Sequence, residues 1–277
     1  MKIAVTGGSG EFGRNLIPYL LEQRHSVVSM DRSLPPVPHP APARPPEYVI
    51  ADTCNFGEVV ASIRGCDALI HLAAHRGPLI HPDSVVYADN TASSYNALSA
   101  AATLGIKRVC LASSINAIGG YYSRSPRYDY FPLDEQHPTY AEDPYSLSKW
   151  VLEQQADAFA RRYEWMSIAS LRFHALLDSN ERAGQASPAR GPFAVRDLWG
   201  YTWLAEANRA CLLSLTADFV GHEVFYIVAR RTMASELSLD LAHKHYPSTV
   251  FRGDLSGHNS FFNCGKAERT LGWRHVD

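Results

Sequence analysis

Short apolar runs alternate along the chain with longer stretches in which apolar residues recur every three or four positions. The short runs are typical of buried strands, and the longer stretches have the period of amphipathic helices. Strands are predicted at residues 2–6, 26–30, 47–51, 68–72, 108–112 and 166–172, and helices at 11–23, 55–63, 82–104 and 145–163. This alternation predicts an α/β fold with a doubly wound parallel sheet and right-handed crossovers. Ligand-binding residues then belong at the carboxyl ends of the strands.

A glycine-rich turn joins the first predicted strand to the first predicted helix. Gly7, Gly10 and Gly13 follow a Gly-x-x-Gly-x-x-Gly spacing. Gly7 allows a tight turn, Gly10 lets backbone N–H groups approach a pyrophosphate, and Gly13 permits close helix packing, which leaves phosphate at the helix N-terminus. The alternative is a tight turn without a ligand. The succession of strand, turn, helix, strand and Asp31 disfavours it.

Asp31 ends the second predicted strand. A carboxylate at this position can accept hydrogen bonds from an adenosine ribose and would repel a ribose 2′-phosphate, so NAD is favoured over NADP. Either Arg14 or Arg32 could pair with such a phosphate. The alternative for both arginines is an ordinary solvated side chain.

Tyr145 and Lys149 are four residues apart in a predicted helix, so their side chains share one face. Lowering the pKa of a phenol from about 10 to near 7 takes roughly 4 kcal/mol, which a neighbouring cation and partial desolvation could supply. Tyr145 would then serve as a general base. The pair alone is a weak motif, because both residues are common on helix surfaces. The glycine turn and the serines Ser113 and Ser114, which follow a predicted strand, strengthen it.

Composition narrows the classes of ligand. The chain has 277 residues, 46% hydrophobic and 19% charged, with a formal net charge of −2, so it can bury a full core but has no electrostatic footprint for nucleic acid or a membrane surface. A small-molecule partner is therefore expected. The five cysteines are dispersed without Cys-x-x-Cys, which argues against disulfides or a metal site. No export signal or membrane-length apolar run is evident, and a cytoplasmic location is predicted.

Two segments fit neither strands nor helices. Residues 34–46 are rich in proline and are predicted to form a stiff loop, with a recognition segment for an aromatic groove as the alternative. Residues 119–144 carry five tyrosines and two arginines, and these side chains could orient a ring substrate or pack the loop down. They are Tyr121, Tyr122, Tyr128, Tyr130, Tyr140, Arg124 and Arg127.

These motifs as a set resemble the extended short-chain dehydrogenase/reductase superfamily, also called the NAD-dependent epimerase/dehydratase family. The resemblance rests on Thr6-Gly-Gly-Ser-Gly10-Glu-Phe-Gly13, Asp31, Asp52, His71-Leu-Ala-Ala74, Asn90, Leu111-Ala-Ser-Ser114, Tyr145-Ser-Leu-Ser-Lys149 and Leu171-Arg-Phe. The segment 113–120 is most similar to uronate dehydrogenases. The resemblance implies an NAD-binding Rossmann domain over residues 1–173, a smaller substrate-binding lobe over 174–277 in which 198–230 returns to the Rossmann sheet, and a homodimer.

The resemblance also implies the role of each residue. Tyr145 would move a proton to or from a substrate hydroxyl, Lys149 would hold the nicotinamide ribose, and Ser114, with Ser113 as the alternative, would hydrogen-bond the reacting oxygen. NAD would be bound by Gly7, Gly10, Glu11, Phe12, Gly13, Asp31, Arg32, Asp52, Thr53, Leu72, Ala73, Ala74, Asn90, Tyr145 and Lys149. The substrate would meet Arg76, Ser113, Asn116, Tyr122, Arg172 and His174.

Two of these assignments have alternatives. Arg172 matches an arginine that binds the substrate carboxylate in uronate enzymes, and a buried structural ion pair is a comparable interpretation. Asn90 is expected to tie its helix to neighbouring backbone rather than to act in catalysis.

The chain also departs from the family's patterns. The uronate enzymes have asparagine and histidine where this chain has Ile115 and Asn116, and serine where it has Arg76. Epimerases and dehydratases usually have a tyrosine where this chain has Ile118, and His174 stands where an asparagine is common. Substrate identity is therefore open. The favoured hypothesis is an oxidoreductase, because the proton-transfer set is complete; an epimerase or dehydratase and a dinucleotide-sensing protein without catalysis are the alternatives.

Overall fold

The computed structural model describes residues 1–36, 45–178 and 192–276. Most of the proline-rich segment 34–46, with its predicted stiff loop, therefore lies outside the described residues. None of the helices within these ranges combines the length and apolar character that a membrane crossing requires.

Seven parallel strands form the central sheet, in the order β3-β2-β1-β4-β5-β7-β10. They are β1 Lys2–Thr6, β2 Ser26–Asp31, β3 Glu47–Ile50, β4 Ala68–His71, β5 Arg108–Ser114, β7 Ser167–Phe173 and β10 Gly221–Ile227. The order reverses at β1, which lies between β2 and β4, so a crevice opens at the carboxyl ends of β1 and β4. The predicted doubly wound parallel sheet is confirmed.

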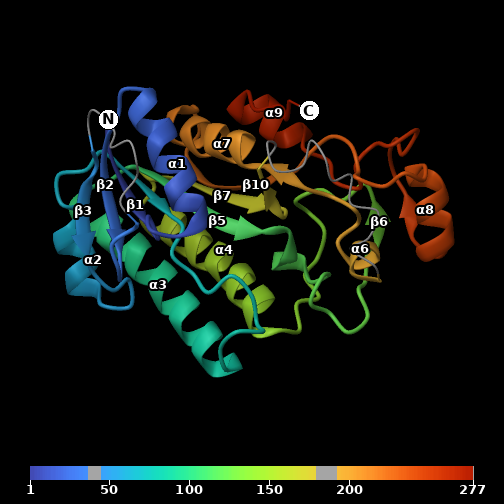
Figure 1. Cartoon of the computed structure of the whole chain (residues 1–277), viewed down its shortest axis with the longest axis horizontal. Helices are drawn as coiled ribbons and strands as arrows, with labels where there is room; N and C mark the ends of the chain where they lie inside the picture. Colours follow the sequence, from blue (N-terminus) through green and yellow to red (C-terminus); the bar gives the residue numbers. More distant parts are fainter. Residues whose placement is uncertain (37–44, 179–191, 277) are drawn as a thin grey trace.

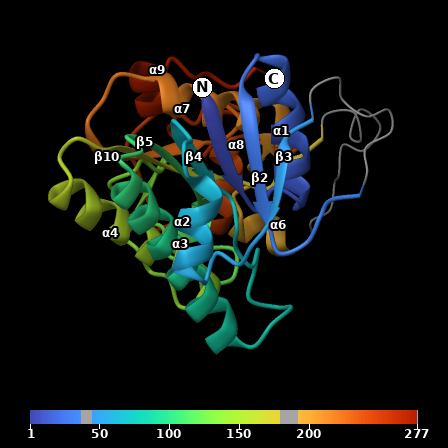
Figure 2. The ribbon, with the colours of Figure 1, turned by 90° about the vertical axis from the view of Figure 1, so that its left-hand side faces the viewer.

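Helices cover both faces of this sheet (Figures 1 and 2). One face carries α1 (Glu11–Glu22), α7 (Leu204–Thr216) and α9 (Gly265–Leu271), and the other carries α2 (Phe56–Ile63), α3 (Asp83–Leu104) and α4 (Pro144–Arg162). Because both faces are covered, a central strand such as β4 is buried throughout and does not alternate between apolar and polar residues.

A smaller lobe brings together segments that are far apart in the sequence. In this lobe β6 (Tyr130–Phe131) pairs with β11 (Val250–Phe251), and Leu133 forms an isolated bridge with Phe262. The lobe also contains α8 (Ser238–His245), and its core joins Phe131 to Leu241 and Phe261. The tyrosine-rich segment therefore contributes to this lobe, while β10 and α7 pack with the central sheet.

Short elements complete the described chain. They are a 3-10 turn at Ile115–Ile118, α6 (Pro192–Arg196) and a two-stranded pair of β8 (Leu176–Leu177) and β9 (Thr202–Trp203).

Candidate active site

The glycine turn packs against the end of β4. Gly7 has φ +70°, and a Cβ on this residue would lie 2.7 Å from the Ala73 nitrogen. A Cβ on Gly13 would lie 2.5 Å from the Gly7 oxygen, so α1 can approach the turn only with glycine there. Gly10 is the N-cap of α1, and as a glycine it has no side chain that could cap the helix. The first N–H groups of this helix are thus available to an anion.

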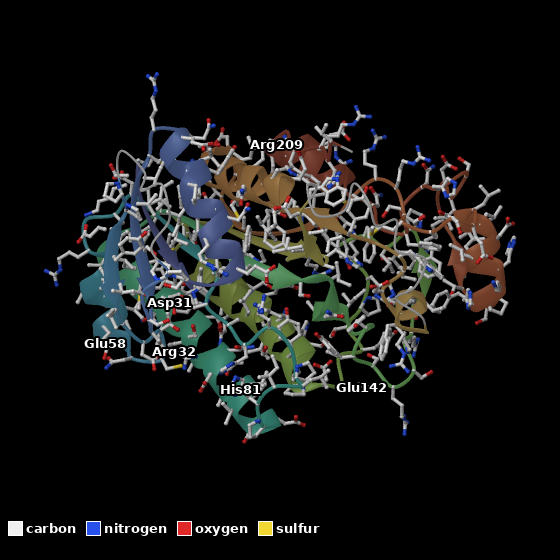
Figure 3. The ribbon with its side chains drawn as sticks, in the orientation of Figure 1. Asp31, Arg32, Glu58, His81, Glu142 and Arg209 are labelled. Carbon is white, nitrogen blue, oxygen red and sulfur yellow. The ribbon has the colours of Figure 1, made fainter. Side chains whose placement is uncertain are left out.

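Asp31 is held at the end of β2 by two backbone donors. Ser9 N donates to Asp31 Oδ2 at 2.9 Å, and Arg32 N donates to Oδ1 at 2.7 Å. Figure 3 shows Asp31 and Arg32 beside each other at this end of the strand. A carboxylate oxygen accepts more than one hydrogen bond, so Asp31 can still accept from ribose hydroxyls.

Asn90 hydrogen-bonds to two neighbouring elements of the structure. Its Oδ1 accepts from His75 N at 2.8 Å, and its Nδ2 donates to His75 O at 3.2 Å and to Ser148 Oγ at 3.0 Å. These bonds join α3 to the loop after β4 and to α4. They match the structural tie expected of Asn90.

The helix that carries Tyr145 begins at a strong cap. Asp143 Oδ1 accepts from Tyr145 N at 3.0 Å and from Ser146 N at 2.9 Å, and Pro144 occupies the first turn. The Ser114 side chain lies close enough to the Tyr145 hydroxyl to lower the pKa of the phenol, and Lys149 Nζ donates to Ala112 O at 2.7 Å. The sequence-predicted triad of Ser114, Tyr145 and Lys149 is therefore assembled where β5 ends.

The pKa of Tyr145 differs from the expectation. Burial raises it to about 12, although the bond from Ser114 acts in the opposite direction. Lys149 does not offset this burial, because its Nζ is bound to Ala112 O and lies 5.8 Å from the centre of the Tyr145 ring. Burial also lowers the pKa of Lys149 to about 8. The lowered phenol pKa predicted from the sequence is thus wrong for the protein alone.

Arg172 does not line the cavity, so its assignment as a carboxylate-binding residue needs correction. Its Nε donates to Glu153 Oε1 at 2.9 Å and its Nη2 lies 2.7 Å from Glu153 Oε2. The two side chains are only 5% and 3% exposed. Burial alone would lower the pKa of Arg172, but the Glu153 carboxylate raises it above its ordinary value. The structural ion pair is therefore the interpretation that holds.

Ser113 also hydrogen-bonds to Glu153. Its Oγ donates to Glu153 Oε1 at 2.6 Å, on the opposite side of β5 from Ser114. This bond leaves Ser114 as the serine that meets Tyr145.

His174 lines the cavity, but both ring nitrogens bond to backbone. Nδ1 accepts from Ala175 N at 2.7 Å, so Nε2 carries the hydrogen that bonds to Asp197 O at 2.8 Å. The ring packs against Gly200 and Phe262. These bonds fix the orientation of the ring in the cavity wall, and its contact with substrate stays a prediction.

Asn116, Tyr122 and Arg76 line the cavity as predicted for substrate contacts. Asn116 Oδ1 accepts from Tyr121 N at 3.2 Å, which orients the amide and leaves its NH₂ group as a donor. The Tyr122 ring packs edge-on against Tyr145 at 5.8 Å. Arg76 is exposed and pairs with Glu11 Oε2 at 2.5 Å.

The predicted cofactor residues share one cavity of about 650 Å³. Its lining includes Gly7, Gly10, Glu11, Phe12, Gly13, Asp31, Arg32, Asp52, Thr53, Leu72, Ala73, Ala74, Asn90, Tyr145 and Lys149. It extends from the end of β2 to the start of α4, a path that suits an extended dinucleotide. Among the described residues, no group of three or more His, Cys, Asp or Glu side chains could hold a metal ion.

The sequence reading missed residues whose partners lie on other elements. Glu153 is the most important, and its spacing of four residues after Lys149 was the signal for a shared helix face. His75 and Asp89, whose side chains pair at 2.8 Å, also line the cavity. No sequence spacing indicated that pair.

The fold and the cavity define a dinucleotide-binding protein of the doubly wound α/β class. The chain belongs to the NAD dependent epimerase/dehydratase family, whose sequence model matches residues 3–186. The resemblance seen in its motifs is confirmed.

Curated relatives match parts of the chain. A 3-beta-hydroxysteroid dehydrogenase from Mycolicibacterium neoaurum is 43% identical over 74 residues, which cover 26% of this chain and 19% of the relative. A dTDP-6-deoxy-L-talose 4-dehydrogenase (NAD(+)) from Aggregatibacter actinomycetemcomitans is 25% identical over 184 residues, which cover 63% and 61% of the two chains. The chain thus spans less than two thirds of these relatives' lengths.

Solved structures match the fold over nearly the whole chain. UDP-glucose 4-epimerase from Thermotoga maritima has a TM-score of 0.71 and 21% identity, covering 99% of this chain and 93% of that one. A mutated uronate dehydrogenase has a TM-score of 0.69 and 21% identity, with coverage of 100% and 82%. An NAD-bound short-chain dehydrogenase/reductase superfamily protein from Agrobacterium tumefaciens has a TM-score of 0.72 and 22% identity, with coverage of 100% and 93%.

Proposed function

We propose that the protein is an NAD-dependent oxidoreductase acting on a secondary alcohol or hemiacetal, or the corresponding carbonyl, of a ring-bearing polar substrate. The observation that carries the proposal is the juxtaposition of Ser114 and Tyr145 at the cavity wall, with the buried Lys149 beside them. A protein that only senses a dinucleotide has no need of this arrangement.

The residues of the cavity fit NAD. The open N-terminus of α1 beside the glycine turn suits the pyrophosphate, and Asp31 suits the adenosine ribose. Asp52 and Thr53 would flank the adenine, and Lys149 would hold the nicotinamide ribose. Bound there, NAD would supply the hydride acceptor for alcohol oxidation, and NADH would supply the hydride donor for carbonyl reduction.

Tyr145 is protonated at neutral pH because its pKa is about 12. It can therefore donate its proton to the oxygen of a carbonyl substrate as that oxygen becomes a hydroxyl, with Ser114 bonded to the same oxygen. Alcohol oxidation runs the other way and requires the phenolate. Burial disfavours that form in the protein alone, and Lys149, whose Nζ is bound to Ala112 O, does not offset it.

The substrate end of the cavity favours a ring. Tyr121 and Tyr122 pack edge-to-face at 4.9 Å, and Tyr122 packs in the same manner on Tyr145, so aromatic surface adjoins the proton donor. The Asn116 amide offers N–H donors to an oxygen of the substrate. The names of the two dehydrogenase relatives, a steroid and a deoxysugar enzyme, both describe ring alcohols. Because Arg172 is engaged by Glu153, we do not propose carboxylate recognition by that residue.

The test is a panel of sugars, uronates, steroids and other cyclic alcohols incubated with NAD or NADP and followed at the NADH absorbance band. A dehydrogenase produces net NADH, whereas an epimerase converts its substrate without net NADH. Absence of turnover over the whole panel, with NAD bound, would favour the sensing protein.

The Tyr145→Phe variant tests the proton donor. Turnover should fall by a factor on the order of 10² to 10⁴, while NAD affinity measured by calorimetry stays the same. Tyr140→Phe is the matched control, because the Tyr140 hydroxyl bonds to Asp129 and its side chain does not line the cavity. Near-normal turnover by Tyr145→Phe would show that the assignment is wrong.

Two further expectations extend the proposal. The lobe around β6 and β11 would contribute to substrate binding, and the family resemblance suggests a homodimer. Sedimentation of the purified chain tests the homodimer.

A further inference from the structure

Three side chains of α4, spaced four residues apart, hold the end of β5. Each contacts one of the last three residues of that strand. Tyr145 faces Ser114, Lys149 Nζ donates to Ala112 O at 2.7 Å, and Glu153 Oε1 accepts from Ser113 Oγ at 2.6 Å. The spacing places all three side chains on one helix face.

Glu153 is in turn fixed by Arg172 on the neighbouring strand. The guanidinium binds both carboxylate oxygens, and its Nη1 lies 3.3 Å from Tyr226 Oη. Arg172 is aligned with Ser113 in the parallel pairing of β5 and β7. The carboxylate thus connects α4 to both strands, in a region with almost no solvent exposure.

We propose that Glu153 and Arg172 are positioning residues for the proposed reaction. They hold the end of β5 so that Ser114 meets Tyr145, and the Glu153 carboxylate lies one helical turn beyond Lys149 on the same face of α4. This inference rests on the proposed function, in which Lys149 serves the dinucleotide.

Among the residues that the structure describes, few charged or titratable groups lie near Lys149. Tyr145 and Glu153 lie on its own helix, His71 faces it from β4, and Arg172 lies behind Glu153 on β7. Burial lowers the pKa of His71 to about 3, and the ring is therefore neutral near pH 7. Burial likewise lowers the pKa of Lys149, and Glu153 opposes this effect. Glu153 is thus the group that favours the charged form of Lys149.

Neutralising Glu153 should therefore act on Lys149 in two ways. The favourable carboxylate is lost, and Arg172 remains as an unpaired cation that disfavours a second positive charge nearby. Neutralising Glu153 and Arg172 together removes the second effect. If the pair only stabilised the fold, the pKa of Lys149 would not differ between the single and the double variant.

The experiment measures NAD affinity by calorimetry between about pH 6 and pH 10, the range around the pKa of about 8 for Lys149. In the unmodified protein the affinity should fall as Lys149 loses its proton. In Glu153→Gln the midpoint of this fall should move to lower pH by about one unit or more. In Glu153→Gln/Arg172→Gln it should lie between the other two.

Asp157→Asn is the matched control. Asp157 lies one turn beyond Glu153 on the same helix and pairs with the buried His222 at 2.7 Å, so the change also neutralises a paired carboxylate. Its midpoint should equal that of the unmodified protein. Circular dichroism verifies that each variant is folded.

The outcomes separate the two proposals. An unchanged midpoint in both Glu153 variants, with NAD still bound, overturns the positioning role and leaves the dinucleotide site intact. Failure of the folded unmodified protein to bind NAD overturns the proposed function and the inference with it. If Glu153→Gln alone does not fold, the double variant decides, and its midpoint must lie below that of the unmodified protein.

Discussion

Replacing Lys149 with methionine should stabilise the fold at neutral pH while impairing NAD binding. The ammonium is buried, and burial lowers its pKa from 10.5 to about 8. That difference corresponds to a cost of roughly 3 kcal/mol for keeping the charge in the folded protein. Methionine keeps most of the aliphatic length and carries no charge.

Two features determine how much stability the Lys149→Met protein gains. The bond to Ala112 O is lost, which costs about 1 kcal/mol. Glu153 is not left alone, since it retains its bonds to Ser113 and Arg172. The variant should therefore be more stable by about 1 to 2 kcal/mol near pH 7.

The stability gained by Lys149→Met should depend on pH. Because the pKa of Lys149 is lower in the folded than in the unfolded chain, the folded state binds fewer protons between about pH 8 and pH 10.5. The contribution of Lys149 to the stability of the unmodified protein therefore rises between about pH 8 and pH 10.5. The advantage of Lys149→Met should shrink as the pH approaches 10.5.

The assay is equilibrium urea unfolding near pH 7 and near pH 10, followed by tryptophan fluorescence. The exposed Lys107→Met is the control and should stay within about 0.5 kcal/mol of the unmodified protein. A Lys149→Met protein that is less stable than the unmodified protein near pH 7, or whose gain in stability is the same at both pH values, would contradict this prediction.

Three more changes test the site. Asp31→Ala should narrow the difference in affinity between NAD and NADP; tighter binding of NADP by the unmodified protein in calorimetry would contradict the role of this carboxylate. Arg172→Met leaves a buried carboxylate without its cation and should cost about 3 to 5 kcal/mol in urea unfolding, most of which Glu153→Gln/Arg172→Met should restore. Gly13→Ala places a Cβ 2.5 Å from Gly7 O and should lower NAD affinity at least about tenfold, whereas Gly57→Ala, with 3.5 Å to its nearest neighbour, should not.

Local patterns were sufficient to predict the central fold. Each strand and helix predicted in the first 173 residues is present in the structure. This is because short stretches of sequence are enough to show the periodicity of buried strands and amphipathic helices. The glycine turn, Asp31 and the Tyr145 helix were predictable for the same reason. Their roles depend on neighbours along the chain and on the carboxyl edge of a parallel sheet.

Partners that come from other elements could not be predicted. An ion pair was among the alternatives for Arg172, but its partner Glu153 became identifiable only when β7 was placed against α4. His174 is similar, because the acceptor for its Nε2 is a backbone oxygen 23 residues away. The pKa of Tyr145 depends on how many atoms surround it, which no local spacing encodes.

The pairing of β6 with β11 has a consequence for protein engineering. Because the smaller lobe draws on residues near 130 as well as on residues 237–262, the lobe cannot be exchanged as one contiguous segment from a relative. A graft of the C-terminal segment alone would set foreign side chains against Phe131 and Leu133. The segment 128–133 is followed eleven residues later by Pro144 and the Tyr145 helix, so a mismatch there would also disturb the side of the cavity that holds Tyr145. Chimeras of this family should exchange both segments together.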